Sequence, residues 1–323
     1  MRLTFDSDGV NKLLDRVGFG CWGLGGDSYG PIDRNDATEL VKYAYERGIR
    51  AFDTSPLYGD GTSEQILGLA LHEYNRNTFT LITKAGLFKK NGEEIRDYLP
   101  ERIKTSVNES LSRLNTDFID YFLIHSPNES EFRENYKNCF GIRAELEQGK
   151  VKNLGISLKA PKDFEFAKDL FELSAIEFNL SLMDQRARYS NDELGNRSIF
   201  KVARTPYNFG FLTDQPPGPV PPQDKRNHLN AWPQEQFIVW HEFRSHWKRI
   251  ADLNSMSLSE FALLFCLSHD LVDLVIPGFM NKAQVDAAVN VMNQGKLSKD
   301  SMFEIHQLYT EIESKFNLVT RLN

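Results

Sequence analysis

Four side chains suited to acid–base chemistry follow three successive apolar segments of the chain. Asp53, Lys84 and His125 each stand where such a segment ends, and Tyr58 comes shortly after Asp53. A carboxylate keeps a neighbouring ammonium charged, and a charged ammonium lowers the pKa of a nearby phenol from its ordinary value of about 10. A tyrosine tuned in this way could give its proton to a carbonyl oxygen, which a histidine could hold by a hydrogen bond.

Together these residue types indicate reduction of a C=O group, or oxidation of CH–OH in reverse, with a hydride supplied by a cofactor. Taken singly, each has a plainer explanation. A strand-end aspartate is usually a cap, a lysine there is usually solvated, and a loop tyrosine is usually a packing residue. The interpretation therefore depends on all four lying side by side, and so on the elements that carry them.

Short apolar segments alternate with segments of helical periodicity along most of the chain. The expected strands are residues 17–21, 49–53, 80–85, 118–124, 151–157, 175–178, 199–203 and 274–277. The expected helices are a stretch from 36 to a stop at 48, then 62–71, 100–114, a stretch ending at 149, 162–170, a short helix before 199, 235–252, 258–268 and two more near the C-terminus. We expect side-chain caps on the first two, from Asp36 with Glu39 and from Thr62 with Gln65.

Strands without polar alternation are typical of a parallel sheet that is covered on both faces. Eight such strands, most followed by a helix, predict an α/β protein with a (β/α)₈ TIM barrel, and a doubly wound open sheet is the alternative. We expect a single domain over residues 1–323, with a long proline-rich loop (208–234) after the seventh strand and extra C-terminal helices. In such a barrel the chemistry belongs to the C-terminal strand ends, where Asp53, Lys84 and His125 would be neighbours.

Composition argues against several other classes of protein. The chain has 323 residues, of which 41% are hydrophobic and 26% charged, near the globular average. Its net charge of −7 argues against nucleic-acid binding. Cys21, Cys139 and Cys266 are far apart, which argues against a disulfide framework or a zinc finger. The sequence shows neither a signal peptide nor a segment long enough to span a membrane, and we expect a cytoplasmic protein without membrane partners.

Two short motifs match poorly with the sites they suggest. The sequence from Gly18 to Gly23 reads GxGxxG, but the residues after it are a poor start for the helix that a dinucleotide-binding fingerprint requires. We interpret it as a strand end and a loop where a ligand could approach the backbone. His241 and Glu242 begin an HExxH motif, but His246 comes one residue too late to share the helix face, and no metal site is expected.

In its longer motifs the chain resembles the aldo-keto reductase family. The resemblance covers most of the chain and rests on residues 51–59 (AFDTSPLYG), 61–64 with 67–68, 82–85, 119–127, 149–157 and 276–278. It implies a (β/α)₈ barrel that uses NADP(H), less often NAD(H), and no metal. It also implies a catalytic tetrad of Asp53, Tyr58, Lys84 and His125, with Tyr58 as the general acid.

The resemblance also assigns residues to the cofactor. Ser157 and Asn179 correspond to positions near the nicotinamide carboxamide, residues 203–213 to a loop around the pyrophosphate, and residues 276–284 to the site of the adenosine and its 2′-phosphate. The expected cofactor contacts are Gly20, Cys21, Trp22, Ser157, Asn179, Arg204, Pro206, Gly210, Leu212, Gly278, Lys282 and Gln284.

Three positions depart from the family pattern at the cofactor. Ala175 stands where a glutamine is usual, and Ala287 and Ala288 stand where a glutamate and an asparagine are usual. Lys282 is the nearby cation that could bind a 2′-phosphate. The choice between NADP(H) and NAD(H) therefore stays open, with NADP(H) favoured.

The substrate side is less well defined by the sequence. Trp22, Tyr29, Leu57 and Phe88 are the expected walls of the pocket, and residues 224–226 of the proline-rich loop could fold over its entrance or over the cofactor. We predict an NAD(P)H-dependent oxidoreductase acting on a small aldehyde or ketone. Two alternatives stay open, a cofactor-binding regulatory subunit and a non-redox epimerase or dehydratase. A monomer and a homodimer are both allowed.

Overall fold

The computed structural model describes residues 1–5, 15–90, 93–131, 148–158, 163, 173–190, 198–215, 224, 226–227 and 234–316. Apart from residues 148, 149 and 163, the expected helices ending at 149 and over 162–170 lie outside these described residues, as do the prolines of 216–222.

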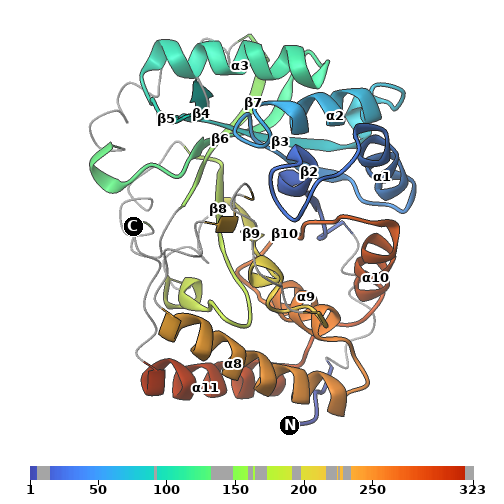
Figure 1. Ribbon diagram of the computed structural model, residues 1–323, viewed down its shortest axis with the longest axis vertical. Helices are drawn as coiled ribbons and strands as arrows, with labels where there is room; N and C mark the ends of the chain where they lie inside the picture. Colours follow the sequence, from blue (N-terminus) through green and yellow to red (C-terminus); the bar gives the residue numbers. More distant parts are fainter. Residues whose placement is uncertain are drawn as a thin grey trace.

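Within this part of the chain, one sheet of eight parallel strands follows the chain order (Figure 1). The strands are β1 (Phe19–Gly20), β2 (Ala51–Asp53), β3 (Thr80–Ala85), β6 (Ile119–His125), β7 (Val151–Ser157), β8 (Ala175–Asn179), β9 (Phe200–Arg204) and β10 (Leu274–Ile276). Parallel bridges from Val17 to Val275 and from Gly20 to Gly278 join the first and last strands. The sheet is thus closed, which confirms the predicted TIM barrel and excludes the open sheet.

Helices surround the barrel on the outside (Figure 1). They are α1 (Arg34–Glu46), α2 (Thr62–Leu71), α3 (Pro100–Leu114), α8 (Gln234–Leu253), α9 (Leu258–Ser268), α10 (Lys282–Met292) and α11 (Lys299–Phe316). Short 3₁₀ turns are η1 (Cys21–Gly25), η2 (Arg76–Thr78), η4 (Arg186–Ser190) and η5 (Asn208–Gly210). α8 and α11 lie side by side below the barrel, where the rings of Phe243 and Tyr309 are 6.3 Å apart. The helices bury the outer face of the sheet, as a parallel sheet requires.

The two expected helix caps are wrong, although both helices form. α1 begins earlier than expected, at Arg34, because the Asp33 carboxylate accepts the backbone N–H groups of Asn35 and Asp36. α2 has Gly61 as its N-cap, with φ of 85° and no side-chain cap. That left-handed conformation favours glycine over any residue with a Cβ.

A β-hairpin follows β3 and was not expected from the sequence. It pairs β4 (Leu87–Lys90) with β5 (Glu93–Arg96) in antiparallel register. The available signal was Asn91-Gly92, a pair typical of two-residue hairpin turns, between two lysines and two glutamates. Apolar alternation is weak on these strands, so a search for buried strands misses them.

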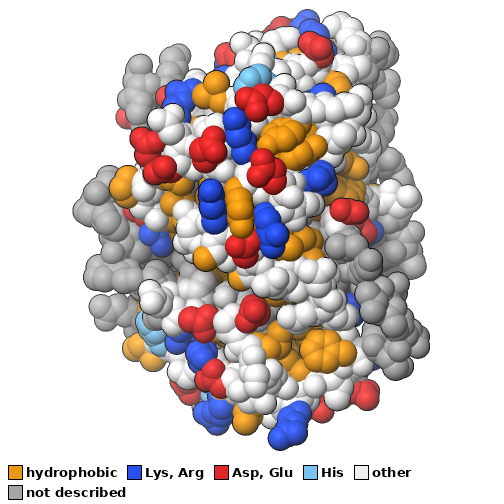
Figure 2. Space-filling view, turned by 90° about the vertical axis from the view of Figure 1, so that its right-hand side faces the viewer, with side chains coloured by type: hydrophobic (Ala, Val, Ile, Leu, Met, Phe, Trp, Pro, Cys, Tyr) orange, Lys and Arg blue, Asp and Glu red, His pale blue; other side chains and the backbone are white. Residues whose placement is uncertain are grey.

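The face that carries α1 and α10 mixes charges of both signs with scattered apolar side chains (Figure 2). Arg47 pairs with Asp286 at 2.8 Å, and Lys42 pairs with Glu73 at 3.3 Å. Such exposed pairs contribute little to stability. Among the described residues, no single helix is long and apolar enough to cross a membrane. α8 and α9 pass such a test only as a pair bent by 91°, and α9 is largely buried in the core.

Candidate active site

The barrel interior is built in layers, and the candidate site is the layer nearest the C-terminal strand ends. A lower layer of apolar side chains forms a cluster of its own, with Ala51, Ile82, Leu123, Ala175, Val202, Leu274 and Ile276. Side chains two residues apart on a strand point to the same face. Two residues beyond the first five of these come Asp53, Lys84, His125, Glu177 and Arg204. The alternation of each strand therefore brings these polar side chains together over an apolar floor.

Lys84 is at the centre of this layer and is fully buried. Its Nζ donates to both carboxylate oxygens of Asp53 at 2.6 Å and to the carbonyl of Thr54 at 3.1 Å, and it lies 3.3 Å from a Glu177 oxygen. Burial acts to lower the pKa of Lys84, but the two carboxylates outweigh burial and the net shift is upward. Lys84 is thus charged at neutral pH, as the sequence predicted.

Tyr58 lies on the loop after β2, with its ring centroid 5.5 Å from Lys84 Nζ and 6.2 Å from the His125 ring. Burial raises the pKa of Tyr58, Lys84 lowers it, and Asp53 with Glu177 raises it further, so the net shift is upward. The expectation of a lowered pKa is therefore wrong for the folded protein. The Lys84 ammonium does lower this pKa, but the burial of the phenol and the second carboxylate, that of Glu177, raise it.

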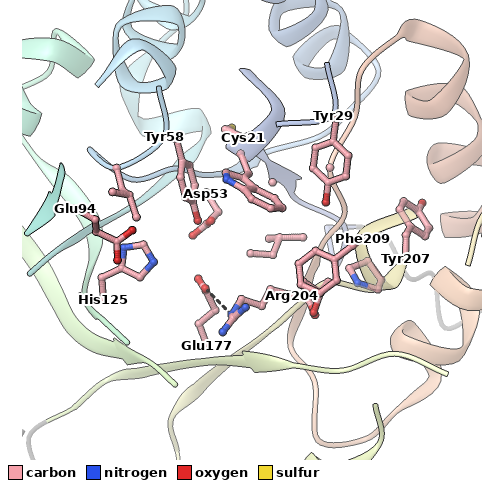
Figure 3. Close-up of a pocket in the computed structure, with 17 residues that line it drawn as sticks. Cys21, Tyr29, Asp53, Tyr58, Glu94, His125, Glu177, Arg204, Tyr207 and Phe209 are labelled. Carbon is pink, nitrogen blue, oxygen red and sulfur yellow. Dashed lines mark hydrogen bonds and ion pairs between the residues drawn. The ribbon is translucent and has the colours of Figure 1, made fainter. Parts of the chain in front are cut away.

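His125 is fixed from two sides. Its Nδ1 is hydrogen-bonded to the Ser55 hydroxyl at 3.2 Å, and its backbone carbonyl accepts a hydrogen bond from the Tyr98 hydroxyl at 2.9 Å. Figure 3 shows its ring on the same side of the cavity as Tyr58. The ring is therefore held where a bound carbonyl could contact both His125 and Tyr58.

These side chains open into a cavity of about 390 Å³. Of the residues predicted for the site, those that line it are Gly20, Cys21, Trp22, Tyr29, Asp53, Leu57, Tyr58, His125, Arg204, Pro206 and Gly278. One wall is aromatic, with the Trp22 ring 5.2 Å from Tyr29 and 6.1 Å from Phe209 in edge-on contacts. A volume of this size suits a nicotinamide ring and a small substrate.

Sequence reasoning missed six residues of the lining, namely Glu94, Glu177, Thr205, Tyr207, Phe209 and Ile276. Two signals could have found some of them. Glu177 follows Ala175 by two residues on one strand, so it shares the inward face. Tyr207 and Phe209 belong to the segment 203–213, which was already assigned to the site.

Two predicted contacts of the carboxamide are engaged within the protein. The Ser157 hydroxyl is buried and donates to Glu177 at 2.9 Å. The Asn179 amide oxygen accepts from the Thr205 hydroxyl at 2.8 Å. Neither residue is part of the cavity lining in this structure.

The remaining predicted residues lie outside the cavity wall. Phe88 is on the hairpin, where the Arg102 guanidinium packs over its ring at 4.2 Å. Gly210 ends η5, and Leu212 is fully buried in the core. Gln284 accepts a hydrogen bond from the Met280 backbone at 2.7 Å, and Lys282 is the exposed first residue of α10.

The residues present fit a nicotinamide dinucleotide. Gly278, whose missing Cβ would meet nothing closer than 3.6 Å, leaves open space at the end of β10 beside the aromatic wall. α10 starts just beyond it, and a helix N-terminus with a lysine in its first turn suits a phosphate. Ala288 is buried in the core, whereas Ala287 is partly exposed. Of the two alanines that stand in place of the family's usual polar residues, therefore, only Ala287 shortens a side chain at the surface.

Comparison with known proteins identifies the family. The model of the aldo/keto reductase family matches residues 16–310. The chain belongs to the aldo/keto reductase family. It is an NAD(P)-dependent oxidoreductase, and the resemblance in its motifs is confirmed over the length of the barrel.

Relatives of this aldo-keto reductase carry both cofactor types in their names. It is 25% identical over 297 residues to the NADH-specific methylglyoxal reductase of Escherichia coli, covering 87% of this chain and 90% of the relative. It is 26% identical over 280 residues to the aldo-keto reductase yakc [NADP(+)] of Schizosaccharomyces pombe, covering 83% and 81%. The solved structure of a glycerol dehydrogenase from Gluconobacter oxydans superposes with a TM-score of 0.76 at 24% identity, covering 99% and 98%. This last likeness supports the fold.

Proposed function

We propose that this aldo-keto reductase reduces a small aldehyde or ketone to an alcohol, with Tyr58 as the general acid. The observation that carries the proposal is one cavity onto which both Tyr58 and His125 open, above a buried Lys84 that Asp53 holds at 2.6 Å. When bound, the reduced nicotinamide supplies the hydride that the carbonyl carbon receives. The raised pKa of Tyr58 keeps the phenol protonated at neutral pH, which is the form that an acid needs.

In this proposal each residue has one task. The His125 ring donates a hydrogen bond to the carbonyl oxygen and orients it. The Tyr58 hydroxyl gives its proton to that oxygen as negative charge develops there. Lys84, held by Asp53, stabilises the resulting phenolate until it regains a proton from solvent.

For the cofactor we favour NADP(H) over NAD(H). The support is Lys282, an exposed cation at the start of α10, whose Nζ lies 5.0 Å from the Tyr43 ring. Two further proposals concern the whole chain. The single matched family barrel supports one domain, and the free, buried Cys21 and Cys266 support a reducing cytoplasmic location.

The test is Tyr58→Phe with two readouts. We expect turnover of NADPH with 4-nitrobenzaldehyde to fall at least about a hundredfold, because a positioned acid contributes roughly 10²–10⁴. Titration of intrinsic fluorescence should show NADPH binding close to wild type, and tighter binding of NADPH than of NADH. Near wild-type turnover in the variant would remove Tyr58 from its role. A wild-type protein that binds NADPH but turns over no carbonyl would instead favour a regulatory subunit or a non-redox enzyme.

A further inference from the structure

Glu177 is a buried charge on the floor of the cavity, and none of the motifs above assigns it a role. It is 1% exposed and lies in the middle of β8. One carboxylate oxygen accepts the Ser157 hydroxyl at 2.9 Å and lies 3.4 Å from Arg204 Nε. The other lies 3.3 Å from Lys84 Nζ. Figure 3 shows Glu177 paired with Arg204 below the space that Tyr58 faces.

A buried carboxylate at this position lowers the stability of the fold unless other groups compensate its charge, so its presence needs an explanation. Burial of an ionised group is unfavourable unless cations and hydrogen bonds compensate it. Asp53 gives the Lys84 ammonium two short contacts, and Glu177 adds a second negative charge beside it. Arg204, which lines the cavity, also donates to the carbonyl of Leu158 at 2.8 Å. Glu177 thus connects the lysine under Tyr58 to the arginine on the opposite wall.

We propose that Glu177 is a positioning residue of the reduction site, which holds Lys84 and Arg204 in place and fixes the charge that Tyr58 faces. This inference rests on the proposed function. Glu177 lies on the cavity floor and is almost completely buried, and its part in this proposal is to hold these two cations.

The charges around Tyr58 support this role. The titratable groups near it come from every element packed around the phenol: Cys21 on η1, Asp53 on β2, Lys84 on β3, Glu94 on β5, His125 on β6, Glu177 on β8 and Arg204 on β9. Glu177 is among the groups that raise the pKa of Tyr58, after burial. Burial raises the pKa of Glu177 itself, but Lys84 and Arg204 outweigh this and the net shift is downward. Glu177 therefore stays ionised and favours the protonated phenol.

The test is the pH profile of Glu177→Gln, a change that removes the charge and keeps the shape. Loss of this negative charge lowers the pKa of Tyr58, because Glu177 is one of the groups that raise it. The single-turnover rate of 4-nitrobenzaldehyde reduction should then fall with rising pH at least about one pH unit earlier than in the wild type. KM for the aldehyde should change little, because glutamine keeps the size and shape of the side chain on the cavity floor. Glu177→Asp keeps the charge and should restore the wild-type profile at a reduced kcat.

Glu64→Gln is the matched control. Glu64 is also fully buried and ion-paired, with Arg113 at 2.6 Å and with Thr83 as a hydrogen-bond donor at 2.7 Å, but it makes no contact with Lys84 among the described residues. It should leave the pH profile unchanged. Profiles of wild type and Glu177→Gln that superimpose through the alkaline range in which the wild-type rate falls would overturn the inference, as would an equal shift in the control.

Two further measurements keep the test decisive. An alkaline titration of tyrosinate absorbance should show an earlier component in Glu177→Gln that disappears in the double variant Tyr58→Phe/Glu177→Gln. If Glu177→Gln does not fold, Glu177→Asp carries the test, and a wild-type kcat in that variant would overturn the inference. If Tyr58→Phe still turns over substrate, the proposed function is refuted. If Tyr58→Phe is inactive but the pH profile of Glu177→Gln is not shifted, only the role proposed for Glu177 is refuted.

Discussion

The proposed proton donor is a tyrosine whose pKa the surrounding protein raises. Lys84 lowers this pKa, but burial and the carboxylates of Asp53 and Glu177 together raise it by more. The useful effect of the lysine is therefore on the transition state, where it offsets the charge that Tyr58 acquires as its proton leaves. A raised pKa also keeps the acid form present across the whole neutral range.

Because Glu94 lines the cavity, we predict that the protein prefers uncharged substrates to negatively charged ones. Glu94 is an exposed carboxylate of the hairpin and lines the same cavity as His125 (Figure 3). A substrate carboxylate in the cavity would be repelled by it. We expect Glu94→Gln to raise kcat/KM for 4-carboxybenzaldehyde about three- to tenfold at low salt, and to leave 4-nitrobenzaldehyde nearly unchanged.

Glu93→Gln is the control for this substitution. Glu93 precedes Glu94 on β5, so its side chain points to the other face, and it is not part of the cavity wall. It should change neither substrate's kcat/KM. Equal gains for the two aldehydes with Glu94→Gln would show that charge is not what this side chain selects.

At the scale of elements, the glycine that leads from β3 into the hairpin β4–β5 helps to position one side of the site. Gly86, between β3 and β4, has φ of 100°, and a Cβ there would lie 2.2 Å from the Tyr98 ring. Tyr98 in turn holds the His125 carbonyl. The close packing of glycine and tyrosine therefore positions the histidine of the proposed site.

Gly86→Ala should disturb both stability and catalysis. Gly48 has a nearly equal φ of 99°, and a Cβ there would have nothing within 4 Å, so Gly48→Ala reports the backbone strain alone. We expect Gly86→Ala to lower the free energy of unfolding by about 1–3 kcal/mol more than Gly48→Ala, because it adds a clash to the strain. Urea unfolding measures the difference, and kcat should fall only for Gly86→Ala. Equal losses at both glycines would mean that Tyr98 moves aside freely.

The sequence was sufficient to predict the barrel, and to predict that Asp53, Lys84 and His125 lie on neighbouring strands, for one physical reason. Parallel strands buried on both faces are readable as apolar runs, and Asp53, Lys84 and His125 end three neighbouring runs. Glu177 and the hairpin were missed because a single glutamate in an apolar strand, or a charged strand, gives no periodic signal. The cap of α1 was misplaced because Asp33 and Asp36 are equally good cap residues, and only the path of the chain decides between them.

At the scale of the whole molecule, a pair of histidines joins the last helix to the barrel. His269, at the end of α9, is 4% exposed and lies 5.6 Å from His306 of α11 between ring centroids. The His269 Nδ1 accepts the Leu271 backbone N–H at 3.3 Å, and His306 Nδ1 is hydrogen-bonded to Gln185 at 2.7 Å. Burial is the main reason that the pKa of each histidine falls to about 4. Both are therefore neutral in the folded protein at neutral pH.

This pair predicts a loss of stability in mild acid. In the unfolded chain a histidine has a pKa of about 6.5, so below that pH the unfolded state binds protons that the folded state does not. Stability is complete above about pH 6.5 and falls as the pH approaches 4, with His269 contributing about 2 kcal/mol of the loss between pH 7 and 5. His269→Asn keeps an acceptor for Leu271 and should flatten this dependence in urea unfolding by about that amount. His72→Asn, at an exposed histidine following α2, should keep the wild-type slope. If wild type and His269→Asn lose stability in parallel, protonation of this buried pair is not what limits the barrel in acid.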